Sequence, residues 1–158
     1  FEIMLKSRQF TPPPEISPEA KSELEKRGSM AQAAGSEKIH VLLQLNYIPS
    51  PERKEELKRQ GVELLAYIPN YAWTAAIPAS DPILRAMSAD VRWIGLLTEE
   101  DKLDSALSAR TFHPWAYDPT TGKVVLLVQF HGDVSAERAR EVIESHGGTI
   151  LNEITSIL

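Results

Sequence analysis

The chain contains no cysteine, and that absence removes several kinds of chemistry. It excludes disulfides, zinc sites built from thiolates and catalysis by a thiol. Long apolar runs are missing too, since no stretch approaches the roughly 20 residues that a membrane-spanning helix needs. The net charge of −5 gives no reason to expect nucleic acid or an anionic membrane surface as a partner. We therefore predict that the chain binds neither nucleic acid nor membrane.

The motifs of common catalytic sites are also missing. No Gly-x-Ser-x-Gly elbow marks a nucleophilic serine. The four histidines do not fall at the close helical spacing of a zinc site, and none belongs to an HExxH pattern. The eight glycines are dispersed, so no glycine-rich loop cradles a phosphate. We predict that the chain is not an enzyme and holds no cofactor or metal.

The sequence does contain an internal repeat. Lys38–Gln60 (KIHVLLQLNYIPSPERKEELKRQ) aligns without a gap on Lys123–Ser145 (KVVLLVQFHGDVSAERAREVIES). After a short slip, GVELLAYI at 61–68 continues the match with GGTILNEI at 147–154. Such a repeat defines one structural unit. The first copy continues beyond the match and the second stops at Leu158, so we expect the second copy to be the first half of a unit.

Residues 1–37 precede the first copy and predict an extended arm followed by a surface helix. Three consecutive prolines at 12–14 favour an extended segment without ladder hydrogen bonds. Ser17-Pro18-Glu19 then provides a helix N-cap, a proline at the first helical position and an early acid. Leu24 is the one large apolar anchor of this helix, which we expect to end near Gly28.

The first full unit begins at Ile39 with a strand whose apolar residues alternate over 39–45. Ser50-Pro51 opens a helix that Gly61 stops. The later pattern predicts strands over 62–68, 71–77 and 91–97, and a helix opened by Asp81-Pro82. The order β-α-β-β-α-β predicts an α+β, ferredoxin-like fold: a four-stranded antiparallel sheet with both helices on one face and the other face open.

The second copy predicts a strand over 124–131, a helix capped by Ser135 and a strand over 149–157. A β-α-β fragment cannot cover its own sheet edges, so its partner must come from elsewhere, and self-association is one source. The predicted organisation is an arm with a surface helix at 1–37, a complete domain at 38–107, a linker at 108–122 and a half-repeat at 123–158.

Two tryptophans of the first unit, Trp73 and Trp93, allow two interpretations. As residues of the core they need no further function. As residues of a partner-binding sheet face they would be anchors, because tryptophan and tyrosine dominate interface hot spots. Both interpretations remain open at this point.

Two stretches of the first unit carry a family resemblance: LAYIPNYAW at 65–73 and VRWI at 91–94. Residues 38–107 resemble the propeptide-type domains that precede the catalytic domains of subtilisin-like (peptidase S8 family) serine proteases, and Lys123 onward resembles the start of a second copy. The resemblance implies a secreted precursor in which an Asp…His…Ser catalytic domain follows this chain.

The resemblance also implies a non-catalytic function: an intramolecular chaperone and inhibitor of a subtilisin-like catalytic domain. The open sheet face would dock on that domain, and the stretch after the last strand would enter the substrate cleft like a bound product. The implied docking residues are Gln44, Tyr67, Trp73 and Trp93, and the implied residues of the cleft tail are Leu97, Leu103 and Leu107.

Two other functions are compatible with the same topology. Tandem ferredoxin-like units would serve as a protein-interaction or self-association module that uses exposed sheet edges. A small-molecule-binding regulatory domain is a weaker alternative, because no ligand-contacting loop stands out. Topology alone does not choose among them.

Overall fold

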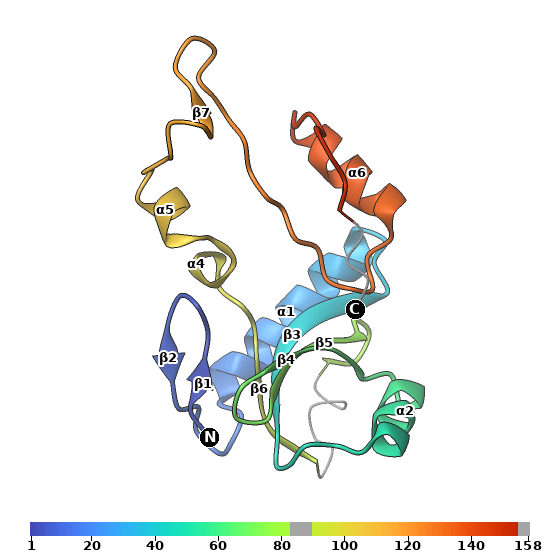
Figure 1. Cartoon of the computed structure of the whole chain (residues 1–158). Helices are drawn as coiled ribbons and strands as arrows, with labels where there is room; N and C mark the ends of the chain where they lie inside the picture. Colours follow the sequence, from blue (N-terminus) through green and yellow to red (C-terminus); the bar gives the residue numbers. More distant parts are fainter. Residues whose placement is uncertain (83–89, 155–158) are drawn as a thin grey trace. The chain divides into compact units, whose positions relative to one another are not determined.

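The computed structural model describes residues 1–82 and 90–154 and divides the chain into two compact units (Figure 1). Unit 1 is Phe1–Leu126 and unit 2 is Leu127–Leu158. Each unit is considered by itself. Within the described residues, no helix has both the length and the apolar character required to cross a membrane.

Unit 1 is built around a four-stranded antiparallel sheet, and the α+β class is confirmed (Figure 1). The strand order is β4-β5-β3-β6, which is the order that a split β-α-β plan produces. The helix predicted to follow Asp81-Pro82 lies outside the described residues, so the complete ferredoxin-like plan stays a prediction. The strands are β3 (Lys38–Leu45), β4 (Glu63–Ile68), β5 (Ala72–Pro78) and β6 (Val91–Gly95).

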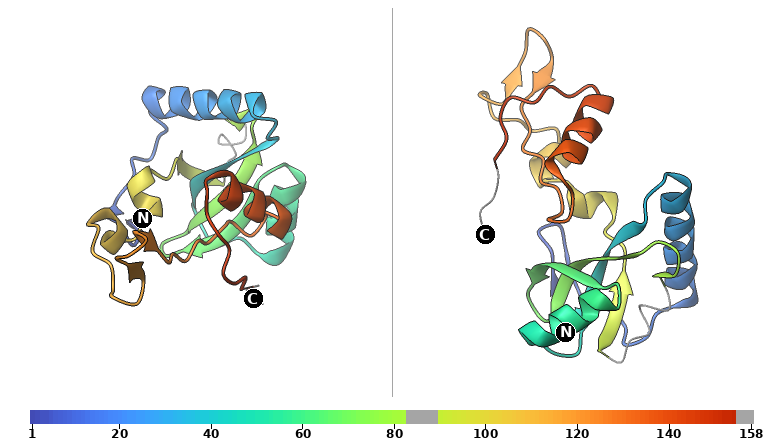
Figure 2. Two further views of the ribbon diagram at one scale, coloured as in Figure 1. Left: turned by 90° about the horizontal axis from the view of Figure 1, so that it is seen from above. Right: turned by 90° about the vertical axis from the view of Figure 1, so that its right-hand side faces the viewer.

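Two helices pack on one face of this sheet, α1 (Pro18–Ala33) and α2 (Pro51–Arg59) (Figure 2). Each begins at the predicted serine cap: the hydroxyl of Ser17 accepts from the amide of Ala20, and that of Ser50 from the amide of Arg53. The helices bury one leucine each against alternate residues of β3. The centre of this core is formed by Leu24, Leu57, Val41, Leu43 and Leu45.

Helix α1 passes through Gly28 and ends at Ala33, so the predicted end near Gly28 is wrong. Gly28 is buried where the helix crosses the backbone that follows β5. A Cβ atom at Gly28 would lie 2.4 Å from the carbonyl oxygen of Ala79, closer than van der Waals contact allows. The glycine therefore permits a close approach of helix and backbone and is not a stop signal.

We expect Gly28→Ala to destabilise unit 1, although alanine is the better helix former. The added methyl group must displace a backbone carbonyl, and overpacking of this kind costs about 1–3 kcal/mol of unfolding free energy. Urea unfolding followed by circular dichroism measures this change. Ser29→Ala at the neighbouring exposed position is the matched control and should leave stability nearly unchanged. Equal stability of the two variants would contradict the packing role of Gly28.

The second face of the sheet is covered by the amino-terminal arm, so the prediction of an open face is wrong. Strands β1 (Ile3–Met4) and β2 (Gln9–Phe10) form an antiparallel hairpin on this face. Ile3 is fully buried there in one cluster with Leu42 of β3 and Ala72 of β5. Because β3 is apolar at successive positions, both of its sides need cover, and the arm supplies the second.

After β6 the chain forms short elements up to the boundary of unit 1. Two single-turn helices come first, and a small hairpin then occupies part of the predicted linker 108–122. These elements are α4 (Glu99–Lys102), α5 (Ser105–Ser108), β7 (Tyr117–Asp118) and β8 (Lys123–Val124).

Unit 2 contains the predicted helix, α6 (Ala136–Ser145), with Ser135 as its cap. The strands predicted on either side of α6 are not formed in the part of the chain that the structure describes. Residues 125–131 and 149–154 have no strand assignment, and residues 155–157 lie outside the described ranges. A strand exists only when a neighbour completes its hydrogen-bond ladder, and unit 2 provides none within the described residues.

Candidate functional site

The arm-covered sheet face is centred on Gln44, which is completely buried. Its side-chain amide donates to the carbonyl oxygens of Phe1 and Asn70, each at 2.9 Å. Its amide oxygen accepts from the guanidinium of Arg92 at 2.9 Å. A buried amide whose hydrogen-bonding groups are satisfied within the chain is a structural anchor. Gln44 therefore fixes the arm to the sheet and is not exposed for docking.

The same corner holds the first residues of the chain through further contacts. The Arg92 guanidinium lies over the ring of Phe1, 4.3 Å from its centroid, and donates to the carbonyl oxygen of Pro12 at 3.3 Å. The side chain of Asn70 donates to the carbonyl oxygen of Glu2 at 2.7 Å. The arm is therefore attached by polar contacts as well as by the burial of Ile3.

Trp93 also belongs to the arm-covered face. It is half-buried and meets the ring of Phe10 edge-on, with centroids 5.7 Å apart. Its indole occupies the space beside Gly95, where a Cβ atom would lie 2.4 Å from the ring. The glycine two residues after the tryptophan was the sequence signal for this packing, because neighbours of that spacing share one face of a strand.

Tyr67 and Trp73 lie on the other face of the sheet, the face that carries the helices. Trp73 pairs with Leu43 and Tyr67, and the two aromatic rings meet edge-on with centroids 4.9 Å apart. The ammonium of Lys54 in α2 lies 4.5 Å from the centroid of Trp73. Trp73 is 7% exposed, whereas Tyr67 on the edge strand is 48% exposed.

The four predicted docking residues therefore do not share a face, and that prediction is wrong. Gln44 pairs with Ala72 across β3 and β5, so Trp73, the next residue, points to the opposite side. Of the four, only Tyr67 presents a large exposed surface.

The three predicted tail residues have different surroundings. Leu97 packs into the apolar cluster beneath the arm. Leu107 in α5 is half-buried. Leu103 connects α4 to α5 in extended backbone (φ −102°, ψ 140°) and is 49% exposed. The structure thus leaves Leu103 as the tail residue whose side chain is most accessible.

An acid that the sequence reading missed, Asp101, joins the tail to the arm. Its carboxylate accepts from Nε and Nη2 of Arg8, both at 2.8 Å, and from the hydroxyl of Ser7 at 2.7 Å. It also forms a capping box with Thr98 at the start of α4. The Asp101 side chain is fully covered, and Arg8 is 43% exposed. We call this group the arm–tail latch: Ser7, Arg8, Thr98 and Asp101.

The latch depends on the charge of Asp101. The hydrogen bonds from Arg8, with those from Ser7 and Thr98, hold the pKa of this carboxyl well below its usual range, although burial opposes the shift. A depressed carboxylate pKa stabilises the fold above the pKa of the unfolded chain, about 3.9. That contribution is lost as the pH falls below 3.9 toward the folded-state value.

We expect Asp101→Asn to lower the free energy of unfolding of unit 1 at pH 7 by about 1 kcal/mol, since Arg8 is 43% exposed and solvent screens the ion pair. The difference in unfolding free energy between wild type and variant should shrink between pH 4 and pH 2. In that range the wild-type carboxylate is charged in the folded chain and takes up a proton when the chain unfolds, which favours unfolding. Urea unfolding at several pH values measures both effects. The exposed neighbour Glu99→Gln is the control. A difference that does not vary with pH would contradict the latch.

A second acid that the sequence reading missed is Asp90, which is almost completely buried just before β6. It accepts from the Arg53 side chain of α2 and from the hydroxyl of Tyr47. Its backbone oxygen accepts from the amide of Asn46 at 3.0 Å. Asp90 thereby ties α2 to the sheet. Its function is structural.

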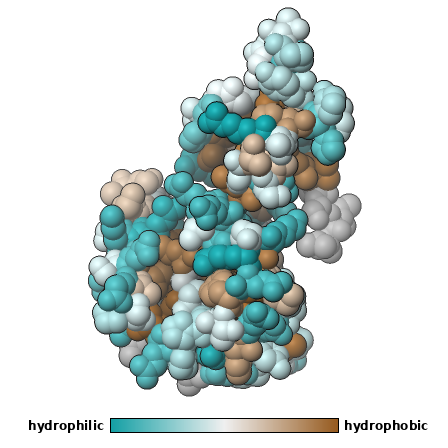
Figure 3. All heavy atoms as spheres, turned by 90° about the vertical axis from the view of Figure 1, so that its left-hand side faces the viewer, coloured by the Kyte–Doolittle hydropathy of each residue, from teal (hydrophilic) through white to brown (hydrophobic). Residues whose placement is uncertain are grey.

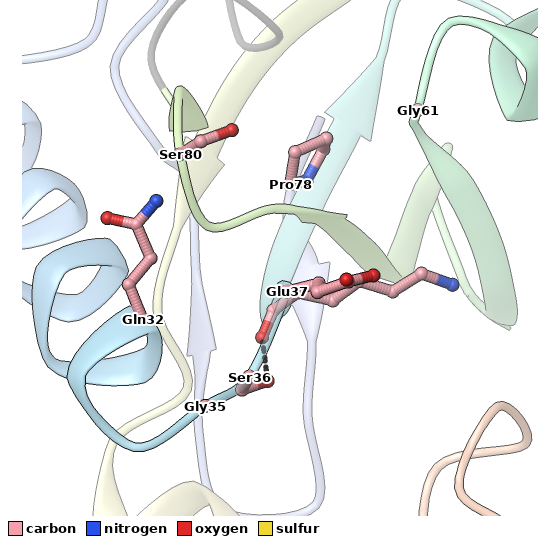
Figure 4. Close-up of a pocket in the computed structure, with 8 residues that line it drawn as sticks. Gln32, Gly35, Ser36, Glu37, Gly61, Pro78 and Ser80 are labelled. Carbon is pink, nitrogen blue, oxygen red and sulfur yellow. Dashed lines mark hydrogen bonds between the residues drawn. The ribbon is translucent and has the colours of Figure 1, made fainter.

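An open depression of about 560 Å³ lies at the carboxyl end of α1 (Figure 4). The hydroxyl of Ser36 donates to the backbone oxygen of Lys38, and the ammonium of Lys38 pairs with Glu63 at 3.0 Å. These contacts show no nucleophile activated by a base. The lining residues are Gln32, Gly35, Ser36, Glu37, Lys38, Gly61, Pro78 and Ser80.

The described residues contain no group of three histidine or acidic side chains arranged to hold a metal ion. What unit 1 does offer is a half-exposed leucine, Leu103, between two short helices whose first, α4, is joined to the arm by the latch.

Fold and site together define an α+β domain with an integrated amino-terminal arm. The family model described as "Domain of unknown function (DUF8729)" matches residues 4–98, more than half of the chain, and the chain belongs to this family. The match begins at Met4 in β1 and ends just after β6, so it includes most of the arm and the whole sheet. None of the curated proteins and none of the solved structures gives a significant match.

Proposed function

We propose that this chain is a non-catalytic pro-region of a secreted subtilisin-like serine protease, which assists folding of the catalytic domain and then inhibits it. The resemblance in 65–73 and 91–94 motivates the proposal. The structure adds that both stretches lie in one sheet, in β4, β5 and β6. The partner is the subtilisin-like catalytic domain.

The observation that carries the proposal is the geometry of the tail. The chain leaves β6 at Gly95, forms α4 and reaches Leu103, which has extended backbone between α4 and α5 and a half-exposed side chain. Proteases bind substrate segments as extended strands, and an exposed leucine is suited to an apolar subsite. The arm–tail latch holds the base of this segment, which limits the conformational entropy that binding would cost.

The arm changes which surface takes part in docking. Because Gln44 and Trp93 are covered, the sheet face that they share does not contact the catalytic domain in this proposal. Tyr67 on edge strand β4 and Leu103 on the tail are the two predicted residues that remain accessible. We assign the principal contact to Leu103, and Tyr67 is a secondary anchor.

The first test is the sequence of the complete gene, which should encode an Asp…His…Ser catalytic domain. The second is inhibition: this chain is titrated against that purified catalytic domain while hydrolysis of a chromogenic peptide is followed. We expect saturable inhibition, and Leu103→Asp should weaken it by more than about tenfold, because a charged side chain would enter an apolar subsite.

Met30→Asp is the matched control, since Met30 is similarly exposed on α1, away from the tail. It should inhibit as the wild type does. A gene without the catalytic triad, or unchanged hydrolysis at a large excess of the chain, would refute the proposal. Equal inhibition by both variants would remove Leu103 from the contact.

A second candidate function, an interaction module that self-associates, is favoured by a separate observation. Unit 2 exposes a series of large apolar side chains next to α6.

A further inference from the structure

Unit 2 presents apolar side chains to solvent at positions that are buried or half-buried in the first copy of the repeat. Leu127 is 85% exposed, whereas its equivalent in the first copy, Leu42, is 0% exposed. Leu151 and Ile154, which follow α6, are 73% and 77% exposed. Hydrophobic residues reach the surface in several places (Figure 3). Such large exposed apolar side chains make unit 2 a candidate interaction surface.

The helix of unit 2 shows that the half-repeat has the same local structure as its counterpart. Ser135 caps α6 as Ser50 caps α2, each accepting from the amide three residues on. The arginine that follows pairs with a glutamate one turn later in both copies: Arg53 with Glu56 and Arg138 with Glu141. The half-repeat therefore has the helix of the first copy, and within the described residues its predicted strand segments have no neighbours to pair with.

Unit 1 shows what covers such a half. Its sheet consists of two interleaved pairs of strands, β3 with β4 and β5 with β6. In the order β4-β5-β3-β6, one strand of each pair lies between the two strands of the other pair. The two inner strands, β3 and β5, run antiparallel and are related by an approximate two-fold axis. The strands that complete the β3–α2–β4 half are thus a second pair, β5 and β6, interleaved with the first.

We propose that the half-repeats of two copies of this chain complete one another across a two-fold axis. Segment 124–131 of each copy forms an inner strand and pairs antiparallel with its mate. Segment 149–154 of each copy forms an outer strand beside the mate's inner strand. The resulting four-stranded sheet has the strand order of unit 1 and buries the apolar residues of both copies. The proposal does not depend on the protease-related function.

The chemistry of the inner segment fits pairing with itself. VVLLVQFH at 124–131 contains no acidic residue, lysine or arginine, so an antiparallel self-pair opposes no like charges. Its valines and phenylalanine favour a strand. Isologous contact about a two-fold axis is also the commonest way in which identical chains associate. When the two segments overlap fully, the two-fold axis passes between Leu127 and Val128. Leu127 of one copy then faces Val128 of the other.

Sedimentation equilibrium of the whole chain tests the proposal. We expect a monomer–dimer equilibrium, and the β signal in circular dichroism should grow with concentration. Leu127→Lys should raise the dimer dissociation constant by more than about tenfold, because it buries a charge at the axis. Since Leu127 is exposed in the single chain, this variant leaves unit 1 folded. Met30→Lys, at an exposed residue of α1, is the control and should dimerise normally.

Cross-linking locates the contact, because the chain has no cysteine of its own. Leu127→Cys chains mixed with Val128→Cys chains should form a disulfide-linked pair on mild oxidation, since directly opposed strand residues have the required spacing. Met30→Cys mixed with Val128→Cys should not.

A chain that stays monomeric at all concentrations would overturn the proposal and show that something else covers unit 2. A dimer that Leu127→Lys does not weaken would overturn it equally. Inhibition of a protease by a strictly monomeric chain would refute self-association and leave the proposed function in place.

Discussion

Strand β3 is buried on both of its sides, and the rest of unit 1 follows from that constraint. One side meets α1 and α2 through Val41, Leu43 and Leu45, and the other meets the arm through Leu42 and Gln44. A sheet whose central strand is apolar at successive positions is stable only between two layers. The arm is therefore the second layer of the domain and covers the side of β3 that carries Leu42. This explains why the family match extends into β1.

Local signals made much of the fold predictable from sequence. The serine caps at Ser17, Ser50 and Ser135 placed the starts of three helices correctly, and the alternation of apolar residues placed the central strand β3. The docking of the arm was not predictable, because its evidence is a set of contacts between residues far apart in the chain. Gly28 shows the same limit. The helix end inferred from Gly28 was wrong, because the glycine makes room for the backbone at Ala79, which follows β5.

The candidate site was predicted less well than the fold. Aromatic residues were chosen as anchors by type, and the alternation of side chains along β5 separates Trp73 from the face of Gln44. Asp101 could not be predicted from sequence, because one acid in an acidic stretch does not differ from its neighbours. Its partner Arg8 reaches it only when the arm is docked. In the second copy, sequence predicted strands that the isolated chain does not form within 125–131 and 149–154. Their absence is informative, because strand propensity is realised only beside a partner.

The arm–tail latch also constrains the order of events during synthesis. Arg8 and Asp101 are 93 positions apart, so the arm leaves the ribosome well before Asp101 and cannot form the latch until the end of the domain has emerged. Closing so long a loop is slow compared with forming the local helices. In the interval the arm is an extended segment beside a growing sheet with one uncovered face. A chaperone that shields this face, or a pause in translation after residue 101, would act on the step at which the arm docks on the sheet.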